Sequence, residues 1–146
     1  MGLISRVEVR NLFSIKSGMA EFFTPQSSHE TMLVQVAGGA NDDLFVHHFQ
    51  TDQLLVVRGS FVLVILQNRK YDYIGLSDRK PAVVKIPRGI PHAAINFSDE
   101  PCLMVNAVLR HGGTDERDYR PLPRPFPYDL DAARSALELL DYPICA

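Results

Sequence analysis

The stretch Pro87-Arg88-Gly89-Ile90-Pro91-His92 constrains the fold of this chain more than any other part of the sequence. Proline fixes φ and glycine permits a positive φ, so two prolines around a glycine favour a tight turn of one shape. The run before the turn, residues 82–86, is rich in β-branched residues and predicts a strand, and residues 93–97 predict the next one. His92 is therefore expected at the start of a strand, behind a rigid corner. Such a position suits a metal ligand or a catalytic base.

Short β-like runs separated by turn signals continue along most of the chain. Residues 38–43, Gly-Gly-Ala-Asn-Asp-Asp, predict a turn, and the continuous apolar run 61–66 predicts a strand that is buried on both faces. Strands of this length and spacing are typical of an all-β fold, a closed barrel or a jelly roll. The other predicted strands are residues 7–16, 20–24, 31–36, 44–50, 53–58, 70–74 and 102–109.

The last part of the chain has a different pattern. Prolines alternate with other residues through positions 121–127, which predicts an extended segment that cannot join a sheet. Asp129 is a suitable N-cap for a helix from residue 130 to about residue 140, with apolar residues on one face at helical spacing. We therefore expect a barrel at residues 1–120. The extended segment and the helix, at 121–146, are expected to pack on this barrel or on a partner subunit.

Length, charge and apolar content exclude several classes of protein. A chain of 146 residues with 46% hydrophobic and 22% charged residues suits a single globular domain. The net charge of −2 gives no electrostatic basis for binding nucleic acid. No stretch approaches the roughly 20 apolar residues of a membrane-spanning helix, and charged residues come too soon after the N-terminus for a secretory signal. Cys102 and Cys145 lie far apart, so we expect a cytoplasmic protein in which both thiols are free.

Four positions within residues 87–96 match the second motif of the cupin family, Pro-x-Gly-x-x-His-x-x-x-Asn. They are Pro87, Gly89, His92 and Asn96. The chain thus resembles a small single-domain cupin. The resemblance implies a single double-stranded β-helix, which is a jelly-roll barrel, and a homodimer formed through barrel edges, exchanged terminal strands or the C-terminal helix.

The first motif of the cupins is His-x-His, then Glu and then Gly, and residues 46–59 are similar to it. His48 and Gly59 match, whereas Val46 stands in place of the first histidine and Asp52 in place of the glutamate. In metal-binding cupins the motif histidines and the carboxylate hold one ion. The resemblance therefore implies a metal site made by His48, Asp52 and His92. Two imidazoles and a carboxylate suit one divalent transition metal, Fe, Mn, Ni, Cu or Zn.

His47 and His48 are adjacent in a predicted strand, so their side chains are expected on opposite faces of the sheet. The alignment with the motif selects His48 as the residue that faces the barrel interior, with Gln50 on the same face. His47 is then expected on the outer face or at an interface. Whether Asp52 or Gln53 faces the cavity stays open, because a shift of one residue would exchange them.

The tripeptide His48-Phe49-Gln50 also resembles the His-Phe-Gln of the dTDP-4-dehydrorhamnose 3,5-epimerases, which are metal-free cupin-type barrels. Residues 84–92 are likewise similar to the Ile-Pro-Pro-Gly-Phe-Ala-His corner of that family. The resemblance implies that His48 is a general base that takes a proton next to a carbonyl, with His92 across the site. An imidazole titrates near neutral pH, which suits such a reaction. The candidate ligand-binding residues are Gln50, Gln53, Arg88 and Asn96.

Three functions are consistent with these residues. The first is an enzyme similar to sugar epimerases or isomerases, in which His48 is the base that acts on a keto-sugar or a related carbonyl compound. The second is a metal-dependent cupin enzyme, an oxygenase or isomerase, that uses His48, Asp52 and His92. The third is a non-catalytic cupin that binds a small ligand and senses it. All three predict a small-molecule partner.

Overall fold

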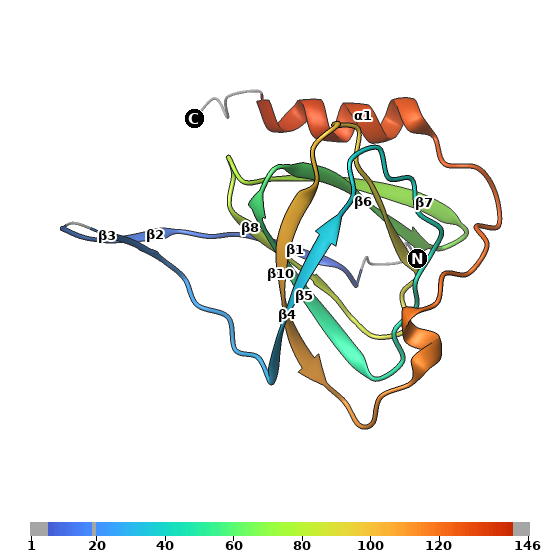
Figure 1. Cartoon of the computed structure of the whole chain (residues 1–146), viewed down its shortest axis with the longest axis horizontal. Coiled ribbons are helices and arrows are strands. Elements are labelled where there is room, and N and C mark those ends of the chain that lie inside the picture. Colours follow the sequence, from blue (N-terminus) through green and yellow to red (C-terminus); the bar gives the residue numbers. More distant parts are fainter. Residues whose placement is uncertain (1–5, 19, 142–146) are drawn as a thin grey trace, which may run out of the picture.

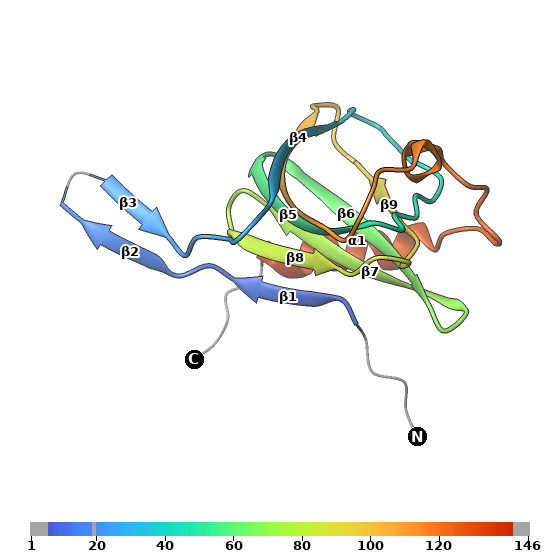
Figure 2. The same ribbon diagram turned by 90° about the horizontal axis from the view of Figure 1, so that it is seen from below.

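Two antiparallel sheets packed face to face form the body of the protein (Figure 1, Figure 2). The structure is a computed structural model and describes residues 6–18 and 20–141. The larger sheet consists, in spatial order, of β1 (Glu8–Asn11), β8 (Ala82–Ile86), β5 (Gln50–Arg58), β10 (Cys102–Arg110) and β4 (Glu30–Val36). The smaller sheet consists of β7 (Lys70–Ser77), β6 (Ser60–Gln67) and β9 (His92–Ile95). The predicted all-β jelly roll is confirmed.

The central strand of the smaller sheet, β6, is buried on both faces, as its continuous apolar run predicted. Phe61, Leu63 and Ile65 point into the core between the sheets. Val62 and Val64 point to the other face, where they are fully buried in a second apolar cluster beneath the C-terminal helix. β6 therefore contributes one face to the core between the sheets and the other face to the apolar cluster beneath the helix.

The helix α1 (Leu130–Glu138) covers the outer face of β6 and β7 (Figure 1). Asp129 caps it as predicted, because its Oδ1 accepts a hydrogen bond of 3.0 Å from the backbone N–H of Ala132. Ala133 is completely buried against the strands, and a Cβ added at Gly75 of β7 would lie 2.5 Å from the carbonyl oxygen of Ala136. The helix thus packs on its own barrel, at a distance that only a glycine in β7 allows.

The proline-rich segment 121–127 runs extended from the barrel to α1, but it does contact a strand-like segment. Leu122 and Leu44 exchange two backbone hydrogen bonds of 2.7 and 3.1 Å, because Leu122, unlike the prolines around it, has an N–H to donate. Arg124 then pairs with Asp43 at 2.8 Å and stacks over the ring of Tyr128. A short 3-10 helix, η2 (Leu139–Asp141), follows α1. Cys145 and the rest of 142–146 lie outside the described residues, as do residues 1–5.

A two-stranded arm projects from the barrel in both views (Figure 1, Figure 2). It consists of β2 (Ser14–Ser17) and β3 (Ala20–Phe23), which pair with each other. The sequence predicted one strand over residues 7–16, but the structure divides it at residues 12–13. β1 pairs with β8 of the barrel and β2 belongs to the arm.

The predicted strand at 44–50 is only partly formed, and this changes the orientation of the side chains within it. Leu44 and Phe45 make isolated bridges, the chain bends at His48 and Phe49, and β5 begins at Gln50. Regular alternation therefore starts at Gln50 and does not extend back to the two histidines.

Within residues 6–18 and 20–141, no helix combines the length and the apolar character that crossing a membrane requires.

Candidate functional site

A cavity of about 270 Å³ lies between the two sheets. Its walls come from inward-facing residues of β4, β5, β6, β9 and β10. The segment before β5 contributes His47, and the 3-10 helix η1 (Glu116–Tyr119) contributes Tyr119. Of these residues, Tyr119 is 45% exposed to solvent.

Three buried titratable side chains, His47, Asp52 and His92, converge in this cavity. The Nε2 atoms of both histidines lie 3.3 Å from the same oxygen, Oδ2 of Asp52. One ligand atom from each of the three residues lies within 4.8 Å of the other two. Asp52, and not Gln53, is therefore the inward residue at the start of β5.

The carboxylate of Asp52 is held by neighbours on both of its oxygens. Its Oδ1 accepts hydrogen bonds from Gln50 Nε2 at 2.6 Å and from Asn106 Nδ2 at 2.9 Å. Burial alone would raise the pKa of Asp52, but hydrogen bonds from His47 and His92 outweigh burial and hold this pKa far below its ordinary value. Asp52 is therefore a fixed carboxylate to which the histidine side chains are directed.

The corner that the sequence predicted fixes the ring of His92. Gly89 has a φ of 83°, in the region that favours glycine. Nδ1 of His92 lies 2.9 Å from the backbone oxygen of Ile90. A carbonyl oxygen can only accept, so Nδ1 carries a proton and Nε2 faces Asp52.

The same corner also positions His47. Phe45 and His92 exchange backbone hydrogen bonds of 2.8 and 3.0 Å, and the N–H of Gly89 donates to the carbonyl oxygen of His47 at 2.8 Å. The ring of His47 thereby lies 5.0 Å from that of His92, centroid to centroid. Its Nδ1 is buried and has no hydrogen-bond partner among the described residues. The expectation that His47 lies on the outer face is wrong, because the bend at His48–Phe49 interrupts the alternation on which it rested.

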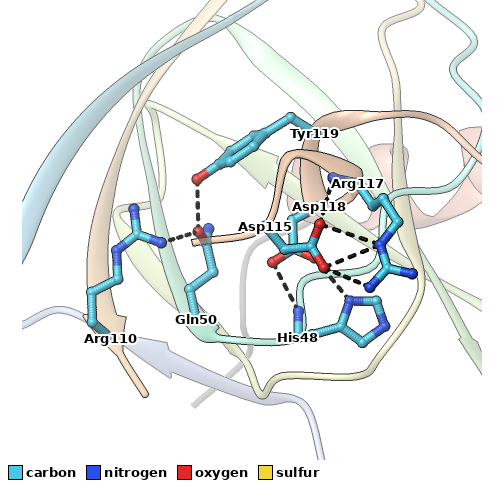
Figure 3. Close-up of polar contacts among 7 residues, drawn as sticks. All are labelled: His48, Gln50, Arg110, Asp115, Arg117, Asp118 and Tyr119. Atoms are coloured by element: carbon cyan, nitrogen blue, oxygen red, sulfur yellow. Dashed lines mark hydrogen bonds and ion pairs between the residues drawn. The ribbon is translucent and has the colours of Figure 1, made fainter. Parts of the chain in front are cut away.

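His48 does not line the cavity, so its predicted inward orientation is wrong too. Its side chain lies beside Asp118 (Figure 3). Its Nδ1 lies 2.8 Å from Oδ1 of Asp118, and its backbone N–H donates to Oδ2 of Asp118 at 3.0 Å. The side chain of His48 is 53% exposed. The predicted set of His48, Asp52 and His92 is therefore not brought together, and His47 takes the place expected of His48.

The tie between His48 and Asp118 holds the segment that carries Tyr119. Burial raises the pKa of Asp118, but the hydrogen bonds from the ring and the backbone of His48 outweigh burial and lower it. Asp118 lies within η1, directly before Tyr119. His48 thus holds η1 in position through hydrogen bonds made outside the cavity, and Tyr119 of η1 forms part of the cavity wall.

Tyr119 is a site residue that the sequence analysis did not identify. Its hydroxyl donates to Oε1 of Gln50 at 2.9 Å, and its ring lies 5.6 Å from that of His47, centroid to centroid. Arg110 Nη1 donates to the same oxygen of Gln50 at 2.9 Å (Figure 3). Neither Tyr119 nor Asn106 belongs to a motif, and only the return of the chain after β10 brings Tyr119 to the cavity.

Of the four candidate ligand-binding residues, the structure places Gln50 alone in the cavity wall. Gln53 faces outward, where its Nε2 donates to two backbone carbonyl oxygens at 2.9 Å each. Asn96 is buried but bonds to the backbone of the turn that follows β9. Arg88 is exposed on the corner and does not line the cavity.

The chemistry of the donor set fits a divalent transition metal. Two imidazole nitrogens and one carboxylate oxygen are typical ligands of such ions. The separation of 3.3 Å between each histidine Nε2 and Oδ2 of Asp52 is near that of two atoms bound at roughly 2.0–2.2 Å to a shared ion. The carbonyl of Ile90 orients His92. Gln50 and Asn106 orient Asp52, as outer contacts do in metal sites.

No family model matches the chain, and no curated protein matches it. Several solved structures are similar. A dTDP-sugar isomerase from Desulfovibrio desulfuricans has a TM-score of 0.69 and 15% identity, with 91% of this chain and 96% of that chain covered. A TDP-quinovose 3,4-ketoisomerase from Campylobacter jejuni has a TM-score of 0.64 and 13% identity, covering 82% and 95%.

A third similar structure belongs to a dTDP-4-dehydrorhamnose 3,5-epimerase from Sulfolobus tokodaii. Its TM-score is 0.61 and its identity 12%, with 78% of this chain and 76% of that chain covered. Identities this low establish the likeness of the fold alone. The chain thus has the cupin-type jelly-roll fold that it shares with these sugar isomerases and epimerases.

Proposed function

We propose that this protein is an isomerase-like or epimerase-like enzyme that moves a proton next to the carbonyl group of a small molecule, with His47 as the general base. The observation that carries the proposal is the pairing of His47 with the buried carboxylate of Asp52 inside the cavity, while Nδ1 of His47 has no hydrogen-bond partner in the part of the chain that the structure describes. The role of general base that the resemblance to the epimerases implied for His48 passes to its neighbour.

The pair of His47 and Asp52 has the arrangement that a base requires. When the Nε2–H of His47 donates to Asp52, the lone pair on Nδ1 is free to take a proton from a carbon next to a carbonyl. The imidazolium that forms is stabilised by the same carboxylate, as in other His–Asp pairs. Return of a proton to the opposite face of the same carbon completes an epimerisation. Where that carbon carries a hydroxyl, delivery of a proton to the former carbonyl carbon, with loss of the hydroxyl proton to form the new carbonyl, completes an isomerisation.

Tyr119 is placed to serve as the acid in this reaction. Its ring is next to His47 and its hydroxyl is held by Gln50, so both groups line the same cavity. A hydroxyl in this position donates a hydrogen bond to the carbonyl oxygen as negative charge develops there. The similar structures named above are sugar isomerases and an epimerase, which supports this class of reaction.

The exchange of hydrogen for deuterium at the carbon next to a carbonyl, followed by NMR in D2O, tests the proposal without knowledge of the natural substrate. We expect the wild type to accelerate exchange in small ketones. We expect His47→Gln to lower the rate by roughly 10²-fold or more, the usual contribution of a general base. His48→Gln is the matched control, because it changes the adjacent histidine outside the cavity. Equal losses in the two variants would refute the assignment of His47.

Binding of a ligand without any exchange would favour the ligand-sensing function over catalysis. In that case, ketones would raise the melting temperature of the wild type, since binding to the folded state alone stabilises it. No deuterium would enter the ligand above the background rate.

A metal-dependent enzyme is the second candidate, and the convergence of His47, Asp52 and His92 favours it. These three side chains would hold the ion, which would supply Lewis acidity toward a carbonyl oxygen. The test is titration of the purified protein with Co²⁺, followed by its visible absorption and by calorimetry. We expect one equivalent of Co²⁺ to bind, and we expect Asp52→Asn to weaken this binding strongly. Asp99→Asn is the control, because it changes an exposed carboxylate away from the cavity, and it should leave the binding unchanged. Absence of binding at millimolar Co²⁺ would exclude this candidate.

We also propose that the protein forms a homodimer in which the projecting arm of one subunit packs on the other. Phe13, Ile15 and Phe22 of the arm region are 76%, 57% and 54% exposed. A two-stranded hairpin is marginally stable by itself in water. A second subunit would bury these side chains and so stabilise the arm.

A further inference from the structure

The cavity has a polar end and an apolar end, and the strand register sets them apart. Along β5, inward-facing Gln50 and Asp52 are followed by inward-facing Leu54. On β10, Asn106 is paired with Leu54, and Met104 follows one pleat further along. On β6, Ile65 is paired with His92, so the cavity-lining Leu63 and Phe61 lie progressively further from the histidines.

The apolar end of the cavity is lined by buried side chains. Phe61, Leu63 and Met104 are at most 2% exposed and belong to the main core cluster. A hydroxyl placed against these side chains would lose its bonds to water and gain none, at a cost on the order of 1–3 kcal/mol. This end therefore favours carbon and hydrogen in whatever molecule enters the cavity.

The charge of the cavity wall is unsuited to a phosphate. Among the described residues that line it there is no lysine or arginine, whereas Asp42 and Asp52 are both present. Arg110, which does not line the cavity, donates to the cavity residue Gln50 and to Glu30, at 2.9 Å each. Phosphate recognition ordinarily relies on cationic side chains or on backbone N–H groups at a helix N-terminus.

The size of the cavity limits the ligand as well. A volume of about 270 Å³ is slightly below the roughly 300–1,000 Å³ typical of pockets for drug-sized ligands. A molecule of this volume has room for a carbonyl group and a short tail, but a nucleotide would have to remain outside.

We infer that the substrate is a small, uncharged carbonyl compound with an apolar tail, and that it carries no phosphate or nucleotide. The carbonyl group lies at the polar end, beside His47 and Tyr119, and the tail lies against Leu54, Leu63 and Met104. This inference rests on the proposed function for the reaction, but the class of ligand follows from the cavity wall itself.

A series of straight-chain methyl ketones from 2-butanone to 2-octanone tests the apolar end without altering the protein. Calorimetry should show that each added methylene tightens binding by about fourfold until the cavity is full, which corresponds to about 0.8 kcal/mol per buried methylene. An affinity that stays flat or falls with chain length would overturn the inference, as would no binding of any ketone at millimolar concentration.

Dihydroxyacetone phosphate, fructose and dTDP-4-keto-6-deoxyglucose are the comparison ligands. We expect each to bind at least tenfold more weakly than 2-hexanone, because they place charge or hydroxyl groups against the apolar end. Tighter binding of either phosphate-bearing compound would overturn the inference.

Met104→Gln replaces an apolar side chain with a polar one of similar length and should weaken binding of 2-hexanone by about tenfold. Met104→Leu stays apolar and should change binding by less than threefold, which controls for altered packing. If both variants weaken binding equally, the polarity of this end does not select the ligand and the inference is wrong.

Measuring deuterium exchange on the same ligands separates the inference from the proposed function. Ketones that bind with the expected dependence on chain length but do not exchange would support the ligand class and reject the proposed reaction. Exchange confined to the phosphate-bearing compounds would support the proposed reaction and reject the ligand class.

Discussion

The rings of His47 and His92 lie 5.0 Å apart, and each directs its Nε2 atom to Oδ2 of Asp52. The corner that carries His92 also binds the backbone of residues 45–47, so one rigid element sets both histidines. The geometry of the pair therefore depends on backbone hydrogen bonds between distant segments. Substitutions at the surface should leave it unchanged.

Tyr119→Phe removes the hydroxyl that Gln50 holds at the cavity wall. We expect the rate of proton exchange to fall by about 10²-fold, because the carbonyl oxygen loses its acid, whereas KM should change little. Tyr71→Phe is the control, since the hydroxyl of Tyr71 bonds to the carbonyl oxygen of Phe126 outside the cavity. An unchanged kcat in Tyr119→Phe would remove Tyr119 from the reaction.

Asp118→Asn should reduce stability in a way that depends on pH. The pKa of Asp118 is lowered in the folded protein because its bonds to His48 outweigh burial, so the ionised carboxylate stabilises the fold above the ordinary value of about 3.9. This stabilisation is lost as the pH falls from about 3.9 through the lowered pKa that Asp118 has in the folded protein.

Melting temperatures of the wild type and Asp118→Asn, compared between pH 7 and pH 2.5, measure this dependence. We expect the wild type to melt higher at pH 7 and the difference to shrink as the pH falls. Asp99→Asn, at an exposed carboxylate, is the matched control. A difference that is the same at every pH would show that ionisation of Asp118 contributes nothing.

Gly75→Ala should loosen the helix from the barrel. A Cβ at this position would lie 2.5 Å from the carbonyl oxygen of Ala136, so α1 or β7 must shift. We expect a loss of about 1–3 kcal/mol in the free energy of unfolding, measured by urea denaturation. Gly113→Ala, where an added Cβ meets nothing within 4 Å, should change it by less than about 0.5 kcal/mol. Equal stability of the two variants would contradict the close approach.

Phe22→Asp should dissociate the proposed dimer by placing a charge in the interface that the arm forms. We expect analytical ultracentrifugation to find the wild type dimeric at micromolar concentration and this variant monomeric. Leu139→Asp changes another exposed apolar residue, beyond the end of α1, and should leave the dimer intact. Dissociation by Leu139→Asp alone would assign the interface to the C-terminal helix. A wild type that is monomeric would reject the dimer.

The amino-acid sequence by itself determined the fold class and, within the site, the corner that carries His92. The proline and glycine positions around residue 89 allow one kind of turn, and β-branched runs of regular length favour short strands. Both signals are local, so they identified the barrel, the two-sided burial of β6, the capped helix and the position of His92 without tertiary information.

Only the tertiary structure decided which of His47 and His48 enters the cavity, and which tyrosine joins it. The bend that interrupts alternation at His48–Phe49 accompanies pairing of Phe45 with His92 and the bond from Gly89 to His47. Tyr119 reaches the cavity because His48 and Asp118 fasten η1 beside it. These contacts join residues that are far apart in the chain, and no local propensity encodes them.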